Sequence, residues 1–150
     1  MERDRAAFCR VAWKLFLAGA FFSISIGLTG CNPFKAKPAA EKGVQEFHDR
    51  LNRGHFSGIY QNAHAEFRKA SPEKDFLPFL EAIHRKLGTV QSSKEANWGI
   101  NSQNMTTTVT LVYETKFSGG DATETFNFRI EGNEAILLGY NISSMALITK

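Results

Sequence analysis

The side chains in this sequence that could do chemistry are few and lie far apart. One carboxylate, Glu124, falls among aromatic residues in a stretch where polar and apolar residues alternate. A carboxylate that lines a cavity can act as a general base, and a nearby tyrosine such as Tyr113 or Tyr140 can act as the proton donor. Glu124 also lies close to a Gly-Gly pair, and strand ends beside such turns are usually wet. The first expectation is therefore that its head group reaches water.

Four histidines, His48, His55, His64 and His84, are spread over the middle of the chain. None forms an i, i+4 pair or joins a cysteine at the spacing of metal ligands, so no metal site and no cofactor is expected. We expect each histidine to be a surface or boundary residue. His64 is the strongest candidate for another role, because it lies one turn from Tyr60. The sequence also lacks a nucleophile elbow, a phosphate loop and a Ser/His/Asp signature.

Cys31 has the surroundings of a modified cysteine. The residues Leu28-Thr29-Gly30-Cys31 end an apolar run and precede a segment rich in Pro, Lys and Ala. They resemble the bacterial lipobox, where a lipoprotein precursor is lipidated on cysteine and cleaved before it. The resemblance implies cleavage between Gly30 and Cys31, a diacylglycerol thioether on Cys31, and acylation of the new amino group by a fatty acid such as palmitate.

The residues before the lipobox are organised as a signal peptide. Met1–Lys14 is basic, and Leu15–Leu28 is apolar with a length in the roughly 7–15 residues typical of a signal-peptide core. That is short of the roughly 20 residues that cross a bilayer. The alternative is an uncleaved membrane helix that reaches back through Val11 and Trp13, but Lys14 interrupts it. We expect residues 1–30 to be a cleaved leader.

The lipobox resemblance implies a protein that is anchored to a membrane without spanning it, because two or more acyl chains hold a protein stably. Cys9 would leave with the leader, so the mature chain would have neither a disulfide nor a free thiol. Asn32 stands where an aspartate would resemble an inner-membrane retention signal. The expected location is therefore the bacterial envelope, with the outer membrane facing the periplasm favoured over the inner membrane. Residues 31–40, with two prolines, predict a flexible tether with a reach of about 25–30 Å.

Charge excludes one class of partner. The sequence has 18 Lys and Arg and 15 Asp and Glu, of which four basic and two acidic residues precede Cys31, leaving 14 against 13. The remainder is nearly neutral, and it has no basic stripe interleaved with aromatic residues. Nucleic-acid binding is therefore not expected.

Residues 41–88 have helical periodicity. Three apolar stripes predict three helices: Val44, Phe47 and Leu51; Phe56, Tyr60, Ala63 and Phe67; and Phe76, Leu80, Ile83 and Leu87. Ser71 is the predicted N-cap of the third helix, and Gly88 is its stop. Pro78 conflicts with this pattern, because a proline inside a helix removes a hydrogen bond. Either the helix begins near Lys74 or Asp75, which we favour, or it is kinked at Pro78.

After Gly88 the period changes from 3.6 to 2, which predicts strands. The inward faces are expected to hold Met105, Thr107, Val109, Leu111, Tyr113, Thr115 and Phe117; Ala122, Glu124, Phe126, Phe128 and Ile130; and Ile136, Leu138, Tyr140 and Ile142. Residues 118–121 and 132–133 supply the turns. A less regular strand at about 90–100 precedes them, with Trp98 expected to pack. Serial hairpins of this kind form an antiparallel meander.

Helices followed by such a meander make residues 41–150 an α+β two-layer domain. The order of elements, with Leu51-Asn-Arg-Gly-His-Phe56 through Tyr60, Phe67-Arg68, Ser71 and Leu87-Gly88, resembles small bacterial domains of the nuclear-transport-factor-2-like, cystatin-like superfamily. The resemblance implies a curved four-stranded sheet wrapped around a long helix, a cone-shaped cavity and, often, a homodimer. Members of that superfamily include isomerases and dehydratases as well as domains without activity.

Three hypotheses about function follow. The first is a membrane-tethered, non-enzymatic module that binds an envelope protein or a small apolar ligand. The second is a small cavity enzyme, an isomerase or hydratase that uses Glu124 with Tyr113 or Tyr140. The third is a structural dimer with a filled core. A cavity containing Glu124 and Tyr113 would favour catalysis or ligand binding, whereas an interior filled by side chains would exclude both.

Overall fold

The computed structural model describes residues 33–149. The leader, the cleavage site and Cys31 lie outside the described residues. The elements follow the chain as α1 (Pro33–Asn52), α2 (Phe56–Gln61), α3 (Ala65–Ala70), α4 (Glu73–Leu87), β1 (Val90–Gln103), β2 (Thr106–Phe117), β3 (Gly120–Glu131), β4 (Glu134–Ser143) and α5 (Met145–Thr149).

The first helix begins at Pro33, so the prediction of a flexible tether over residues 31–40 is wrong from residue 33 on, and residues 31 and 32 lie outside the described residues. Ala36 and Ala40 are 2% and 0% exposed and extend the buried stripe of Val44, Phe47 and Leu51 toward the N-terminus. Pro33 occupies the first helical position, where a missing N–H costs nothing. Pro38 lies inside the helix. The buried alanines therefore make this segment part of the domain.

The predicted second helix is two short helices. α2 ends at Gln61, where the Asn62 side chain donates a 2.7 Å hydrogen bond to the carbonyl of Gly58. α3 begins after His64, whose ring caps it. The predicted apolar stripe nevertheless identifies buried residues correctly, because Tyr60, Ala63 and Phe67 are all buried.

α4 carries the predicted stripe of buried residues, but both statements about its start need correction. Pro72 and not Ser71 precedes the first helical residue, and its carbonyl accepts from the backbone N–H groups of Asp75 and Phe76. Pro78 lies inside the helix, so the favoured late start is wrong. The apolar face of Phe76, Leu80, Ile83 and Leu87 begins before the proline, and its burial favours helix through that position.

The four strands form one antiparallel sheet in the order β1-β2-β3-β4, the predicted meander. Every predicted inward residue of β3 is buried. The predicted inward residues of β2 are buried too, with two exceptions: Tyr113 is half-buried, and Met105 lies in the turn before the strand. β4 differs from the prediction. Asn127 pairs with Gly139 and Phe128 with Leu137, so Leu138 is an extra residue in a β-bulge. Leu137 and Tyr140 therefore both face the core, whereas the alternation predicted Leu138 there.

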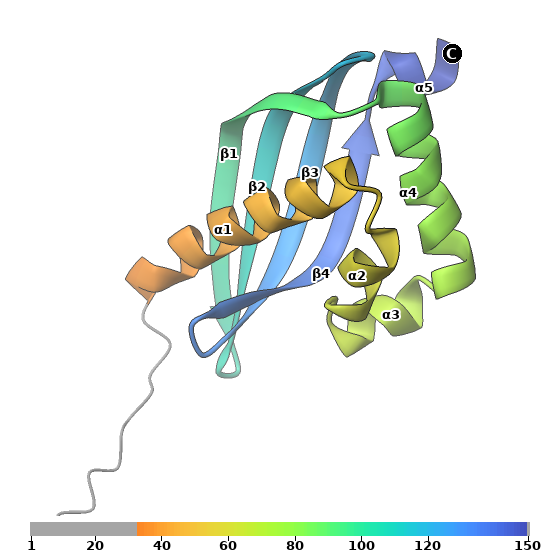
Figure 1. Cartoon of the computed structure of the whole chain (residues 1–150). Coiled ribbons are helices and arrows are strands. Elements are labelled where there is room, and N and C mark those ends of the chain that lie inside the picture. The colour runs from red at the N-terminus through yellow and green to blue at the C-terminus, as the bar shows by residue number, and fades with distance from the viewer. Residues whose placement is uncertain (1–32, 150) are drawn as a thin grey trace, which may run out of the picture.

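Helices cover one face of the open, curved sheet, with α1 crossing it and α2, α3 and α4 gathered toward β4 (Figure 1). This is the predicted α+β fold, in which α1 and the sheet share one core. Trp98 does not pack as predicted: it is 50% exposed, at the edge strand β1. Over residues 33–149, no helix combines the length and hydropathy that crossing a bilayer requires.

Candidate functional site

Glu124 lies at the centre of a buried polar cluster, which we call the Glu124 cluster. Its carboxylate is 0% exposed, so the expectation that its head group reaches water is wrong. The Tyr140 hydroxyl donates to Oε1 at 2.7 Å, and the Thr115 hydroxyl donates to Oε2 at 2.5 Å. His48 Nε2 lies 2.8 Å from the same Oε2. Four elements, α1, β2, β3 and β4, each contribute one of the four residues.

The hydrogen-bond roles in this cluster follow from the carboxylate. An ionised carboxylate can only accept, so we assign the proton between His48 and Glu124 to Nε2 of the imidazole. Three donors then occupy three of the about four lone-pair positions of Glu124. Burial, followed by the charge of Glu124 and its hydrogen bond, raises the pKa of Tyr140 well above the usual phenol value. Tyr140 is thus held as a neutral donor.

The local sequence explains how these side chains meet. Val44, Phe47, His48 and Leu51 stand at i, i+3, i+4 and i+7, so His48 belongs to the buried face of α1 and is only 7% exposed. It was therefore wrong to expect His48 at the surface or the boundary. Thr115 pairs with Ala122 and shares the inner face with Glu124. The bulge at Leu138 places Tyr140 opposite Phe126, where its ring lies 4.5 Å from that of Phe47.

Tyr113 is not part of the Glu124 cluster. It pairs with Glu124 in the register of β2 and β3, but its ring packs edge-on against Phe126. Burial, followed by the charges of Glu95 and Glu41, raises the pKa of Tyr113, and Lys37 opposes them. Of the two predicted proton donors, the structure therefore brings Tyr140 to Glu124 and leaves Tyr113 beside the charges of α1 and β1.

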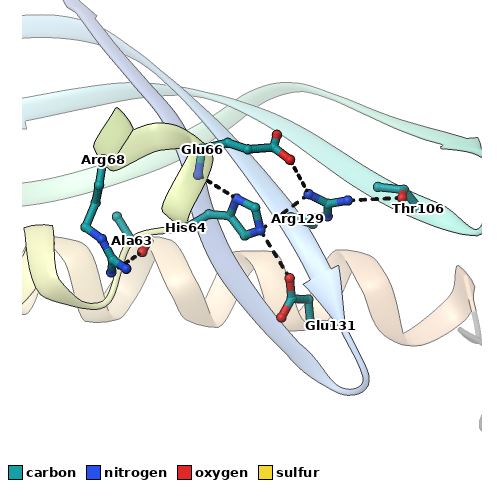
Figure 2. A network of polar contacts seen from close by, with 7 residues as sticks. All are labelled: Ala63, His64, Glu66, Arg68, Thr106, Arg129 and Glu131. Atoms are coloured by element: carbon teal, nitrogen blue, oxygen red, sulfur yellow. Dashed lines mark hydrogen bonds and ion pairs between the residues drawn. The ribbon is translucent and has the colours of Figure 1, made fainter. Parts of the chain in front are cut away.

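His64 has a structural role at the junction of α3 and the sheet (Figure 2). Its ring Nδ1 accepts from the backbone N–H of Glu66, which caps α3. The backbone N–H of His64 donates to the Leu137 carbonyl at 2.8 Å. Nε2 lies 3.3 Å from Oε1 of Glu131. Arg129 joins the same network by donating to Glu66 at 2.9 Å and to Thr106 at 3.2 Å. Through these hydrogen bonds and ion pairs, α3 and its N-cap residue contact β3 and β4 directly and β2 by way of Arg129.

The side chains of the other two histidines make no comparable polar contacts within the described part of the chain. His55 is exposed, as predicted, and His84 is half-buried with its ring edge-on to Phe56 at 5.8 Å. Within residues 33–149, no three His, Cys, Asp or Glu side chains are grouped so that they could hold a metal ion.

A pocket of about 330 Å³ lies beneath α1, and we call it the α1 pocket. Its buried floor consists of Phe47, Ile59, Phe128 and Leu137, and its more exposed rim consists of Lys42, Glu46, Arg50, Asn62, Asn133 and Glu134. Gly43 brings α1 so close to the sheet that a Cβ there would lie 2.8 Å from Phe128. Neither Glu124 nor Tyr113 lines this pocket.

A second, more open pocket of about 720 Å³ lies at the end of the sheet near α5. Thr115 is among its lining residues, but Thr115 is only 1% exposed and donates inward to Glu124. Glu124 and Tyr113 are absent from this lining as well. Glu124, Tyr113 and Tyr140, the residues that could transfer protons, are therefore separate from both of these pockets.

Comparison with known proteins yields no match, either to a protein-family model or to a curated protein.

Proposed function

We propose that this chain is the precursor of a bacterial lipoprotein whose mature domain is a non-enzymatic binding module in the cell envelope. The observation that carries the proposal is the separation just described. Glu124 is fully buried among three donors, whereas the α1 pocket, which is open to solvent, has an apolar floor and lacks it. A general base must come within hydrogen-bond distance of its substrate, and Glu124 is covered by the protein's own side chains.

The α1 pocket is the proposed binding site. Phe47, Ile59, Phe128 and Leu137 supply apolar contact, and the charged and amide side chains around them can orient a ligand. Its volume of about 330 Å³ suits a small apolar molecule or one apolar side chain of an envelope protein. The proposed relationship to the nuclear-transport-factor-2-like superfamily rests on the order of the elements and the one-sided, curved sheet.

The proposed anchor is the lipidated Cys31, and the proposed location is the outer membrane facing the periplasm. The lipobox and the leader before it support this part of the proposal. The test is a Cys31→Ser variant of the full precursor, compared with a Cys9→Ser variant as the control. Labelling with radioactive palmitate and fractionation should show that Cys31→Ser loses both label and membrane association. Continued membrane association of Cys31→Ser would mean that the leader remains as a membrane helix.

Binding at the α1 pocket can be tested with the dye anilinonaphthalene sulfonate, which fluoresces in apolar sites. Ala135 lies in the pocket wall, so Ala135→Trp should fill the pocket and abolish saturable dye binding. Ala96 is exposed on β1, and Ala96→Trp is the matched control, expected to bind as the wild type does. Both variants should melt cooperatively. Equal dye binding by Ala135→Trp and the wild type would contradict the proposed site.

A second candidate function is acid-base catalysis of the isomerase or hydratase type, favoured by the contact of Tyr140 with Glu124 at 2.7 Å. It would require Glu124 to become accessible. Exchange in heavy water of a substrate C–H bond that disappears in Glu124→Gln would favour it over the binding module.

A further inference from the structure

α1 begins close to the proposed lipid attachment site. If Cys31 carries the lipid, as proposed above, only Asn32 separates it from Pro33, the first residue of α1. Two residues of extended chain reach at most about 7 Å. The start of α1 must then lie against the surface of the bilayer, and one end of the domain must face the lipid.

The contacts of α1 identify that end. Lys37 forms an ion pair with Glu95 at 2.9 Å and lies 5.4 Å from the centre of the Trp98 ring. Farther along α1, Asn52 exchanges hydrogen bonds with Val90, at the opposite end of β1. The start of α1 therefore lies toward the β1–β2 hairpin, while α5 and the C-terminus lie at the other end of the molecule (Figure 1).

Two apolar side chains are exposed on this side of the domain. Met105, at the tip of the β1–β2 hairpin, is 102% exposed, and Trp98 is 50% exposed. Lys35, in the first turns of α1, is exposed as well. Tryptophan favours the headgroup region of bilayers, a methionine side chain can enter the acyl boundary, and a lysine is attracted to anionic headgroups. The chemistry of these three side chains fits a lipid surface.

The backbone gives a second reason to regard Met105 as unusual. Asn104 and Met105 have φ values of 51° and 61°, the left-handed conformation of a two-residue hairpin turn. Glycine is the usual second residue of such a turn, because a side chain there is strained. The hairpin between β3 and β4 has a glycine, Gly132, at φ 64° in the first position of its turn, and Asn133 in the second position has no positive φ. Neither the turn geometry nor packing within residues 33–149 accounts for a methionine at position 105.

We propose that the β1–β2 hairpin and the Trp98 side of α1 form a docking surface for the bilayer that holds Cys31. Met105 enters the boundary between headgroups and acyl chains, Trp98 lies at the level of the headgroups, and Lys35 faces anionic lipid. Together with the lipid on Cys31, these contacts fix the orientation of the domain, and α5 points away from the membrane.

The absence of other thiols from the mature chain permits a direct test. Only Cys9 and Cys31 occur in the sequence, so a cysteine introduced into the mature, lipidated protein is its single free thiol. Met105→Cys and the matched control Met145→Cys, on exposed α5, are labelled with the environment-sensitive fluorophore nitrobenzoxadiazole. The proteins are reconstituted in vesicles of phosphatidylethanolamine and phosphatidylglycerol. The label at position 105 should emit as in lipid, and the label at position 145 as in water.

Trp98 supplies an independent readout on an unlabelled protein, because Trp13 is lost with the leader. A lipid with a headgroup nitroxide should quench Trp98, and Met105→Gly, which suits the turn and removes the apolar side chain, should reduce that quenching. Mass spectrometry establishes whether Cys31 carries the lipid. If it does, water-like emission at both labelled positions together with unquenched Trp98 would overturn the docking surface and leave the proposed anchor in place. Absence of that lipid would overturn the proposed anchor and, with it, this proposal.

Discussion

His48 Nε2 lies 2.8 Å from Oε2 of Glu124, which joins α1 to β3 across 76 residues of sequence. The contact is buried on both sides, with 8% of the histidine side chain and 0% of the carboxylate exposed. A buried carboxylate is stable only when it is hydrogen-bonded or paired, so the packing of α1 on the sheet depends on this cluster. Four measurements can establish what this cluster and three other contacts of the helices contribute to stability.

The first concerns the hydroxyl of Tyr140. Tyr140→Phe keeps the ring against Phe47 but removes the hydrogen bond to Glu124, which should lower the free energy of unfolding by about 1.5–3 kcal/mol, the range for a bond to a charged group. Tyr113→Phe is the matched control, because its hydroxyl does not contact Glu124, and should cost under about 1 kcal/mol. Urea denaturation of residues 31–150 measures both. Equal losses of unfolding free energy in the two variants would contradict a stabilising hydrogen bond from Tyr140 to Glu124.

The raised pKa of Tyr140 predicts a loss of stability in alkali. Above about pH 10 the unfolded tyrosine releases its proton while the folded one keeps it, so the native state binds more protons and stability falls as pH rises. The contribution is complete below the unfolded pKa and is lost as the pH approaches the folded pKa. Tyr113 and Lys37, whose pKa values are also raised, add to the slope.

Melting temperatures recorded from pH 8 to pH 11 (roughly spanning the unfolded phenol pKa) should fall less steeply for Tyr140→Phe than for the wild type. Parallel curves would mean that Tyr140 ionises in the folded protein as it does in the unfolded chain.

The capping of α3 by His64 can be separated from its other contacts. His64→Ala removes the ring nitrogen that accepts from Glu66 N–H and should destabilise the domain by about 1 kcal/mol. Asparagine is a favoured N-cap, so His64→Asn should recover most of that loss. Thermal unfolding of the three proteins measures it. If His64→Asn is as unstable as His64→Ala, the contact with Glu131 rather than the cap is what stabilises this junction.

Two helical glycines should respond in opposite directions to the same substitution. At Gly43 a new Cβ would lie 2.8 Å from Phe128, whose ring is 2% exposed and stacked on Phe126. Gly43→Ala should therefore destabilise by about 1–3 kcal/mol, less the helix-propensity gain of up to about 1 kcal/mol. At Gly58 the nearest atom is Arg50 Cδ at 3.9 Å, so Gly58→Ala should stabilise by roughly 0.5–1 kcal/mol. Chemical denaturation of both variants tests the pair, and stabilisation by Gly43→Ala would refute the close approach of α1 to Phe128.

The alternation of residues predicts the sheet better than it predicts the site. Glu124 stands on the face predicted for it, between Ala122 and Phe126, but whether that position is wet depends on what covers it. His48 on α1 covers Glu124, and the alternation of residues in a strand carries no information about which helix packs on it. The sequence places His48 on the buried face of α1, because His48 lies four residues after Val44. The sequence does not predict that Glu124 is the residue it contacts.

Two other differences have local causes that the sequence does not reveal. The bulge at Leu138 turns Leu137 inward and breaks the period of 2, and the one local signal for it is Gly139, which directly follows the extra residue. The start of α1 was missed because Ala36 and Ala40 are too small to register as an apolar stripe and Pro33 and Pro38 suggest an extended chain. The docking of α1 against the sheet buries both alanines and makes the segment helical.

α1 packs against β4, the last strand, as well as against the earlier strands, and Phe47 meets Tyr140 there. During synthesis α1 emerges first, and the hairpins of β1 to β3 can close as each strand follows. Phe47 can meet Phe126 of β3 at that stage, but it lacks Tyr140 until the final strand is made. The cooperative unit is then almost the whole of residues 33–149, and folding waits for its C-terminal end. A ribosome stalled before β4 would hold a chain in which Phe47 still lacks its contact with Tyr140.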